Sequence, residues 1–227
     1  MKIKVSCIQT NSFISPIENI NHVSNLIKKA IKQKSDLICL PECVGIFTDN
    51  KKKLNNFCKN DNIFLNFIKE LSKKYKVHFI IGSLPFIKLN KKFLNKSLVI
   101  NNKGEVIAEY DKINLFDVKL NSKEKYLESK LYDPGKKIKV VSLPWGKLGL
   151  SICYDIRFPD LYKKLAKNGA DFLSIPAAFT KTTGKAHWHS LIRSRAIENG
   201  CFVFAPAQCG VHQNNRETFG HSMIVDP

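Results

Sequence analysis

Apolar side chains along this chain follow two periods in turn, and this alternation restricts the fold more than any other feature. Residues 2–9 alternate apolar and polar positions, as in a strand with one buried face. Residues 19–34 place apolar side chains three and four positions apart, as in an amphipathic helix. Residues 36–42 are a short continuous apolar run, which is typical of a strand covered on both faces. The sequence therefore predicts an α/β chain with helices packed over sheets.

The alternation continues without an internal repeat, a flexible linker or a low-complexity block, so we expect a single domain over residues 1–227. The last predicted strand, 220–227, has no cap or helix after it, and we expect the C-terminal strands of this domain to be missing. The remaining patterns predict helices at 63–71, 159–169 and 185–200, and strands at 77–86, 97–112 (two strands), 138–144, 147–155, 171–176 and 201–208.

The formal net charge of +18 raises the possibility of a nucleic-acid partner. However, 33 of the 37 basic residues are Lys and only 4 are Arg, whereas phosphate and base recognition favours Arg. The lysines are scattered in twos and threes, which is typical of solvated faces. We expect no specific nucleic-acid partner, and a Lys-rich nucleic-acid binder stays open as an alternative class.

The seven cysteines are an odd number with no C-x-x-C pair, which disfavours a disulfide framework or a zinc ribbon. We therefore expect a reducing, cytoplasmic location. The chain has no apolar run of about 18 residues and no signal-peptide pattern at its start, so we expect no membrane association. His187 and His189 are two apart on a predicted helix and point to different sides, so we expect no metal site there.

Three predicted strands end in residues that together could cleave an acyl bond. Glu42, Lys112 and Cys153 stand at these ends, and the carboxyl ends of strands are where sites form in α/β sheets. A carboxylate can take the proton of a thiol, and an ammonium can neutralise a developing oxyanion. Each residue alone also has a plain interpretation, because a cysteine is commonly a small packed side chain and lysines are abundant here.

Three segments, LICLPECVG, YDKINLFDV and LSICYDIRFPDLY, together resemble the nitrilase superfamily of carbon–nitrogen hydrolases. The resemblance implies that Glu42 is the general base, Lys112 the oxyanion-stabilising cation and Cys153 the nucleophile. YLESKLYDPG resembles the segment that carries a second glutamate, here Glu128, and Glu124 is its neighbour without a role.

The resemblance also implies a four-layer α-β-β-α sandwich, a homodimer or higher homo-oligomer, and catalysis without a metal or organic cofactor. In the implied reaction, Cys153 attacks an amide carbon and Glu42 shuttles the protons. The oxyanion is held by Lys112 and the backbone N–H of Tyr154. Ammonia departs, and water then hydrolyses the thioester. A non-catalytic protein on the same fold is the alternative.

Residues 177–227 look like the Nit branch, whose members hydrolyse ω-amides of keto acids or the amide of deaminated glutathione. Within it, the elements AHW, AQCG and NNRETFGHSMIVDP look closer to the deaminated-glutathione amidases than to the omega-amidases. An omega-amidase acting on 2-oxoglutaramate or 2-oxosuccinamate is the alternative. Two departures bear on specificity: Asn114 stands where many relatives have His, and His189 where several have Glu.

A carboxylated amide substrate needs a positive anchor, for which Arg is the preferred residue. We expect Arg193 or Arg195, two apart on a predicted helix, to supply it, although both could merely pair with acidic neighbours. Asp155 and Arg157 are predicted to form an ion pair that shapes the turn after the cysteine.

Overall fold

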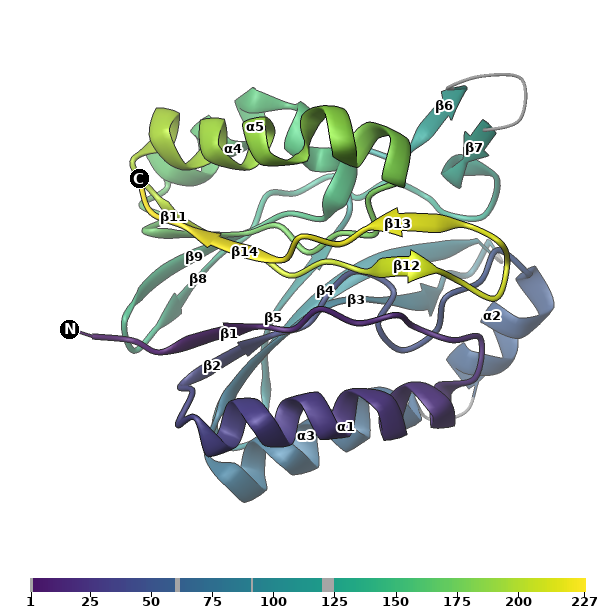
Figure 1. Cartoon of the computed structure of the whole chain (residues 1–227), viewed down its shortest axis with the longest axis horizontal. Helices are drawn as coiled ribbons and strands as arrows, with labels where there is room; N and C mark the ends of the chain where they lie inside the picture. The colour runs from purple at the N-terminus through teal and green to yellow at the C-terminus, as the bar shows by residue number, and fades with distance from the viewer. Residues whose placement is uncertain (1, 60–61, 91, 120–124) are drawn as a thin grey trace.

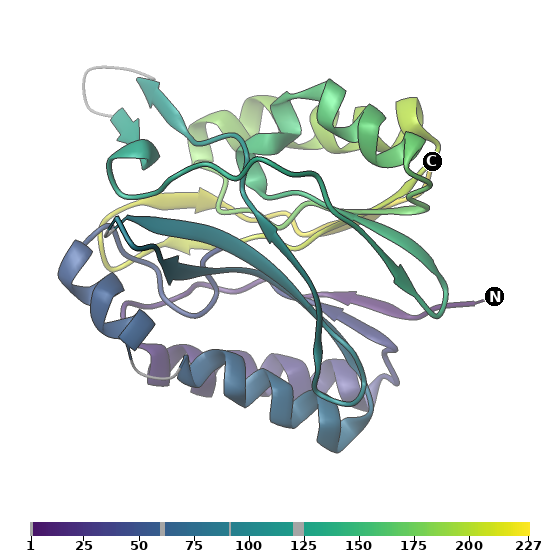
Figure 2. The same cartoon turned by 180° about the vertical axis from the view of Figure 1, so that it is seen from behind.

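The computed structural model describes residues 2–59, 62–90, 92–119 and 125–227. These residues form four layers: two helices, a sheet, a second sheet and again helices (Figure 1). This is the predicted α-β-β-α sandwich. Both chain termini lie at one end of the layers, and the short hairpins lie at the other end in both views (Figure 2).

The first sheet has the strand order β1-β2-β3-β4-β5. The first three strands are parallel, and β4 and β5 are added antiparallel by hairpins. A parallel strand pair needs a crossover connection, which explains why helical patterns separate the first strands in the sequence. The strands are β1 (Val5–Cys7), β2 (Leu37–Cys39), β3 (His78–Ile87), β4 (Phe93–Ile100) and β5 (Val106–Asp111).

The second sheet repeats the plan with the order β14-β11-β10-β9-β8. Here β9, β10 and β11 are parallel, and the outer strands β8 and β14 run antiparallel to their neighbours. The carboxyl ends of the parallel strands in both sheets point to the end of the sandwich opposite the termini (Figure 1). The strands are β8 (Val140–Leu143), β9 (Gly146–Leu150), β10 (Phe172–Ser174), β11 (Phe202–Ala205) and β14 (Met223–Val225).

The helices begin and end at recognisable signals. Helix α1 (Pro16–Lys32) is capped by Ser15, whose side chain accepts from the N–H of Glu18, and α4 (Pro159–Lys167) begins with a proline. Helix α5 (Lys181–Asn199) is capped by Thr180 and ends at Gly200 with φ 60°. It therefore begins four residues before the predicted 185, because the N-cap threonine lies upstream of the apolar pattern.

Two apolar clusters hold the layers together. One lies between the first sheet and the helices α1 and α3 (Ile63–Tyr75), and it includes the fully buried Ile27, Phe64 and Ile68. The other joins the two sheets to each other and to α4 and α5 around Tyr162 and Trp188. Because the second cluster spans both sheets, the two halves share one core.

Several short elements lack an apolar period in the sequence and were not predicted. Helix α2 (Lys51–Lys59) buries only Leu54 and Phe57 of its nine residues. Two hairpins at the end opposite the termini are formed by β6 (Asp117–Lys119) with β7 (Lys125–Leu127), and by β12 (Cys209–Val211) with β13 (Glu217–Phe219).

Candidate active site

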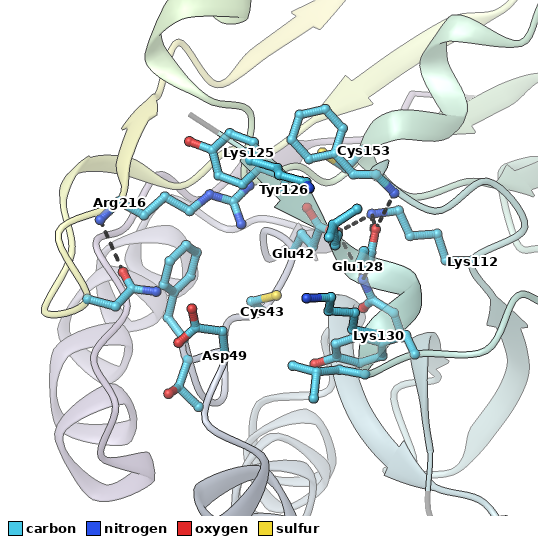
Figure 3. A pocket seen from close by; sticks show the side chains of 18 of the residues that line it. Glu42, Cys43, Asp49, Lys112, Lys125, Tyr126, Glu128, Lys130, Cys153 and Arg216 are labelled. Carbon is cyan, nitrogen blue, oxygen red and sulfur yellow. Dashed lines mark hydrogen bonds and ion pairs between the residues drawn. The ribbon is translucent and has the colours of Figure 1, made fainter. Parts of the chain in front are cut away.

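The side chains of Glu42, Lys112 and Cys153 line one cavity of about 830 Å³ (Figure 3). Glu42 lies in the turn after β2, Lys112 directly follows β5, and Cys153 lies just after β9. The first two strands belong to one sheet and the third to the other. The structure therefore brings together the three strand ends that the sequence singled out, across 111 residues of chain from Glu42 to Cys153.

Cys153 begins a short 3-10 turn (Cys153–Arg157) and has a φ of 49°. This left-handed conformation is uncommon for a residue with a side chain. The N–H of Cys153 donates to the carbonyl of Pro176 at 2.9 Å, which fixes the peptide from the neighbouring strand end. Strained backbone of this kind persists only where the surroundings hold it, and it occurs often at functional sites.

The buried side chain of Asp155 holds this turn in place. Its carboxylate is fully buried and accepts from the N–H of Ile152 at 2.9 Å and from the hydroxyl of Tyr110 at 2.7 Å. Both nitrogens of Asn114 donate to its other oxygen, at 2.9 and 2.8 Å. Asn114 thus links the turn that begins at Cys153 to the segment that follows Lys112.

The predicted ion pair between Asp155 and Arg157 is wrong. The guanidinium of Arg157 lies over the rings of Tyr154 and Phe179, and its Nη2 is 3.2 Å from Nδ1 of His187. Asp155 points the other way, because its oxygens are taken by the backbone and by side chains far away in sequence. The peptide N–H of Tyr154 directly follows the cysteine, and its part in binding an oxyanion stays a prediction.

Lys112 lies between two carboxylates. Its Nζ is 2.8 Å from Oε1 of Glu42, and 3.1 and 2.9 Å from the two carboxylate oxygens of Glu128. The side chain of Lys112 is 2% exposed, so this ion pair cluster is shielded from water. Burying charges is costly unless each is paired and hydrogen-bonded, and this condition is met here.

Further donors hold the two glutamates in place. The amide Nδ2 of Asn95 donates to Oε1 of Glu42 at 2.9 Å and to Oε1 of Glu128 at 3.1 Å. The second oxygen of Glu42 accepts from the N–H of Ala178 at 2.8 Å, and Glu128 accepts from the N–H of Phe116 at 2.7 Å. Glu42 is thus contacted from both sheets. Glu124, the neighbour considered beside Glu128, lies outside the described residues.

The charges of the cluster set its protonation. Burial opposes ionisation of Glu42, but the ammonium of Lys112 outweighs it, so the pKa of Glu42 is lowered. Burial likewise opposes a charged Lys112, but Glu128 and Glu42 raise its pKa well above the usual value. Burial and the charge of Glu42 raise the pKa of the Cys153 thiol. The resting site therefore holds an ionised carboxylate beside a neutral thiol.

A second thiol, Cys43, lines the same cavity. It follows Glu42 with a φ of 57°, and its N–H donates to the hydroxyl of Ser83 at 2.9 Å. Burial and then the charge of Glu42 raise the pKa of Cys43 to about 12. Cys43 is therefore a neutral part of the wall at physiological pH.

Neither of the predicted anchors, Arg193 and Arg195, lines this cavity. Arg193 is exposed, whereas Arg195 is buried, where its Nε donates to the carbonyl of Ile156 at 2.9 Å and its Nη1 pairs with Glu198 at 2.5 Å. The expectation that either serves as an anchor at this site is therefore wrong, because Arg193 lies off the cavity wall and the guanidinium of Arg195 is held by Ile156 and Glu198. His189 also lies off the cavity wall, and its Nε2 is 3.1 Å from Nδ1 of His221.

The arginine that lines the cavity is Arg216, which the sequence analysis did not single out. It directly precedes β13, and its guanidinium lies over the rings of Phe47 and Tyr126, at 5.5 and 5.1 Å from their centroids. Its Nη2 donates to the carbonyl of Ala178 at 2.8 Å. Its Nε is buried without a hydrogen-bond partner among the described residues, which costs about 1–3 kcal/mol.

The described ranges lack the features of two other kinds of site. Over residues 2–59, 62–90, 92–119 and 125–227, no group of three or more His, Cys, Asp or Glu side chains is placed to hold a metal ion. In the same ranges, no helix has the length and apolar character needed to cross a membrane.

The fold and this cluster define a class of protein: residues 4–227 match the family model described as carbon-nitrogen hydrolase, and the chain belongs to this family of hydrolases that act on amides. A relative from Synechocystis sp., a deaminated glutathione amidase, is 39% identical over 226 residues, which cover 98% of this chain and 83% of that protein. The omega-amidase NIT3 of Saccharomyces cerevisiae is 33% identical over 234 residues, covering 100% of this chain and 80% of the relative.

Solved structures agree with this assignment. The NitFhit protein of C. elegans superposes with a TM-score of 0.91 at 39% identity, covering 98% of this chain and 55% of that longer protein. Nit3 of Saccharomyces cerevisiae, a member of branch 10 of the nitrilase superfamily, superposes with a TM-score of 0.87 at 30% identity, covering 99% of this chain and 82% of its own. The predicted nitrilase-type sandwich is confirmed.

Proposed function

We propose that this protein hydrolyses the amide bond of a small carboxylated substrate through a thioester on Cys153. The observation that carries the proposal is the cluster at the cavity wall, in which an ionised Glu42 and a paired Lys112 lie beside a buried thiol on a strained turn. A thiol, a base and a cation in one cavity are the parts that acyl transfer to sulfur needs.

In the first step, Glu42 accepts the proton of the Cys153 thiol while the sulfur attacks the amide carbon. The electron pair of the carbonyl moves to its oxygen, and Lys112 together with the peptide N–H of Tyr154 stabilises that charge. Because the pKa of the thiol is raised and that of Glu42 is lowered, a free thiolate is not stable in the resting site. Proton transfer and attack therefore occur together.

In the second step, the protonated Glu42 gives its proton to the amide nitrogen, the carbon–nitrogen bond breaks, and the amine departs. The acyl group stays on sulfur as a thioester. Glu42, again a carboxylate, then takes a proton from water as the water oxygen attacks the thioester carbon. The carbon–sulfur bond breaks, the acid departs, and Glu42 returns the proton to the sulfur of Cys153. Glu128 holds Lys112 in place throughout, through the contacts at 3.1 and 2.9 Å.

Deaminated glutathione is the substrate that we favour, because relatives 39% identical over nearly the whole chain carry that name. This substrate has carboxylates at both ends and a peptide as its leaving amine. The cavity has a volume of about 830 Å³, and Lys125, Lys130 and Arg216 supply positive charge to its wall. The relation to omega-amidase NIT3 supports 2-oxoglutaramate as the second candidate.

The test is hydrolysis of both candidates by the wild type and by two cysteine variants. Cys153→Ala should lose all turnover with deaminated glutathione and with 2-oxoglutaramate, and should form no acyl-enzyme detectable by mass spectrometry. Cys58→Ala, which changes a thiol outside the cavity, is the matched control and should retain turnover. A Cys153→Ala protein that still hydrolyses amides would contradict the proposed nucleophile.

We also propose that the protein is a cytoplasmic homodimer or higher homo-oligomer. Seven free cysteines are compatible with a reducing compartment. Exposed apolar side chains on α5, β11 and β14 support association: Ile197, Phe202 and Ile224. Light scattering on the purified protein should give at least twice the monomer mass, and cell fractionation tests the compartment.

A further inference from the structure

Arg216 is the feature of the cavity that the reaction described above leaves without a role. The cluster of Glu42, Glu128 and Lys112 carries two negative charges and one positive charge, so it repels an anionic substrate. A carboxylated amide therefore needs a further cation within the cavity. Lys125 and Lys130 line it too, but both are exposed and their ammonium groups remain hydrated.

The position of Arg216 is fixed by aromatic rings rather than by carboxylates. Phe47 comes from the segment after β2 and Tyr126 from β7, and the guanidinium contacts both rings. None of the ion pairs among the described residues includes Arg216. Its positive charge therefore lies at the wall outside any of these ion pairs.

The hydrogen bonds of Arg216 leave donors for a ligand. A guanidinium has five N–H groups in a planar fork. Among the described residues, the guanidinium donates only to the carbonyl of Ala178, at 2.8 Å, and its buried Nε has no partner. Planar forks of this kind bind carboxylates through two parallel hydrogen bonds.

The backbone of Ala178 connects Arg216 to Glu42 through two hydrogen bonds. Its carbonyl accepts from Arg216, and its N–H donates to Oε2 of Glu42 at 2.8 Å. One residue thus bonds to both the guanidinium and the proposed base, and Arg216 and Glu42 line the same cavity (Figure 3). A carboxylate on Arg216 would hold the substrate at a set distance from Glu42 and Cys153.

We propose that Arg216 binds a carboxylate of the substrate and selects anionic over neutral amides. This inference rests on the proposed function, since it names the residue that recognises the substrate of the same site. The carboxylate belongs either to the acyl part or to the leaving amine, and the two sources share the same chemistry at the guanidinium.

The experiment compares Arg216→Gln with the wild type on four amides. Deaminated glutathione carries a carboxylate on both parts, 2-oxoglutaramate on the acyl part only, butanoyl-cysteinylglycine on the amine part only, and butanamide on neither. Arg216→Gln should lower kcat/KM for anionic amides about 10- to 100-fold more than for butanamide, mainly through KM. The single-carboxylate amide with the larger loss identifies the part of the substrate that Arg216 binds.

Arg216→Lys keeps the charge without the fork and should fall between wild type and Arg216→Gln on the anionic amides. It also serves if the glutamine variant does not fold. Arg193→Gln is the matched control, since it removes the same charge from an exposed position off the cavity, and it should keep the wild-type preference.

An equal loss on all four amides would overturn the inference, because it would mean that Arg216 acts only through Glu42. A loss confined to kcat would overturn it for the same reason. Failure of the proposed function gives a different result: the wild type itself would then hydrolyse none of the four amides.

Discussion

The two halves of the molecule contribute to the same cavity in different ways. The half built on the first sheet supplies Glu42, Asn95 and Lys112, whose side chains bond to one another and to Glu128. The half built on the second sheet supplies Cys153 on a left-handed turn and Arg216 with an unpaired Nε. In the cavity, the charged side chains of the first half bond to one another, whereas Arg216 keeps a donor without a partner among the described residues.

This difference separates two requirements of a hydrolase. Charges that must be aimed at a developing oxyanion are most effective when they are fixed beforehand, and in the proposed mechanism the first half does this. Groups that bind the substrate need hydrogen-bond donors without a protein partner, and the guanidinium of Arg216 in the second half is proposed to supply them. Changes in the first half should therefore cost both stability and rate, whereas changes at Arg216 should alter mainly substrate choice.

Of the changes considered, Lys112→Met should cause the largest loss of stability and of hydrolysis rate. It leaves Glu42 and Glu128 buried near each other without their shared cation, and removal of one partner from a buried ion pair costs about 3–5 kcal/mol. Amide hydrolysis should fall by about a hundredfold or more in the fraction that folds. Urea unfolding and kcat/KM measure the two effects.

Lys88→Met is the control for Lys112→Met, because it removes a lysine from an exposed pair with Asp133. A surface pair contributes about 0–1 kcal/mol, so the control should unfold almost as the wild type does. Equal midpoints for both variants would show that the buried cluster is not the main charge interaction in this half.

The pH dependence of stability should report on His212, which joins the halves by stacking on Phe47 at 3.7 Å. Its Nδ1 donates to the carbonyl of Ser12, and its Nε2 lies 2.8 Å from the hydroxyl oxygen of Thr218. Burial lowers the pKa of His212 from 6.5 to about 4. Between these values the unfolded chain binds a proton that the folded chain does not, so stability falls as the pH falls.

The loss from His212 should reach about 3 kcal/mol between pH 6.5 and pH 4, and the contribution should be complete above pH 6.5. Urea unfolding of the wild type and of His212→Gln at several pH values isolates the contribution of His212 to the free energy of unfolding, since glutamine does not titrate. The variant should lose less stability on acidification. Parallel pH profiles would mean that His212 is protonated in the folded protein.

Gly82→Ala should give the smallest of these effects on stability, with a marked effect on rate. An added Cβ would lie 2.2 Å from the carbonyl oxygen of Leu40 and 2.5 Å from Cβ of Pro176, so it would push the end of β2 away from the second half. Overpacking of this kind costs about 1–3 kcal/mol. The thermal midpoint and kcat/KM should both decrease, because Glu42 follows the displaced segment.

Gly200→Ala provides the contrast, since its Cβ would meet no atom within 4 Å and the φ of 60° alone causes strain. It should lower the thermal midpoint while leaving kcat/KM as in the wild type. If Gly82→Ala kept the wild-type rate, the register between the halves would not matter for catalysis.

The sequence predicted the parts of the site that follow strong apolar runs. Glu42, Lys112 and Cys153 each stand at or near such a strand end, and the carboxyl ends of parallel strands gather at one edge. Arg216 was missed because its hairpin, β12 with β13, has only three residues in each strand and no apolar alternation. The adjacent Asn214 and Asn215 were the available signal, since Asn favours left-handed turns, and Asn215 has a φ of 63°.

The wrong expectations have two physical causes. Arg195 does pair with its neighbour Glu198, but neither residue lines the cavity. The Asp155–Arg157 pair was chosen from residues close in sequence, whereas the side-chain partners of Asp155 lie far away. Asp155 is held by Tyr110 and Asn114, which are 45 and 41 positions away. Local spacing carries no information about such long-range hydrogen bonds.

The side chain of Gln208 bonds to Ser12, 196 residues earlier, and to the carbonyl of Glu42, 166 residues earlier. During synthesis the ribosome adds about 5–20 residues per second, so roughly 10–40 s separate the two ends of the Ser12 contact. Until Gln208 emerges, the turn that carries Glu42 lacks this support, so its carbonyl gains the contact only after 208 residues have been made.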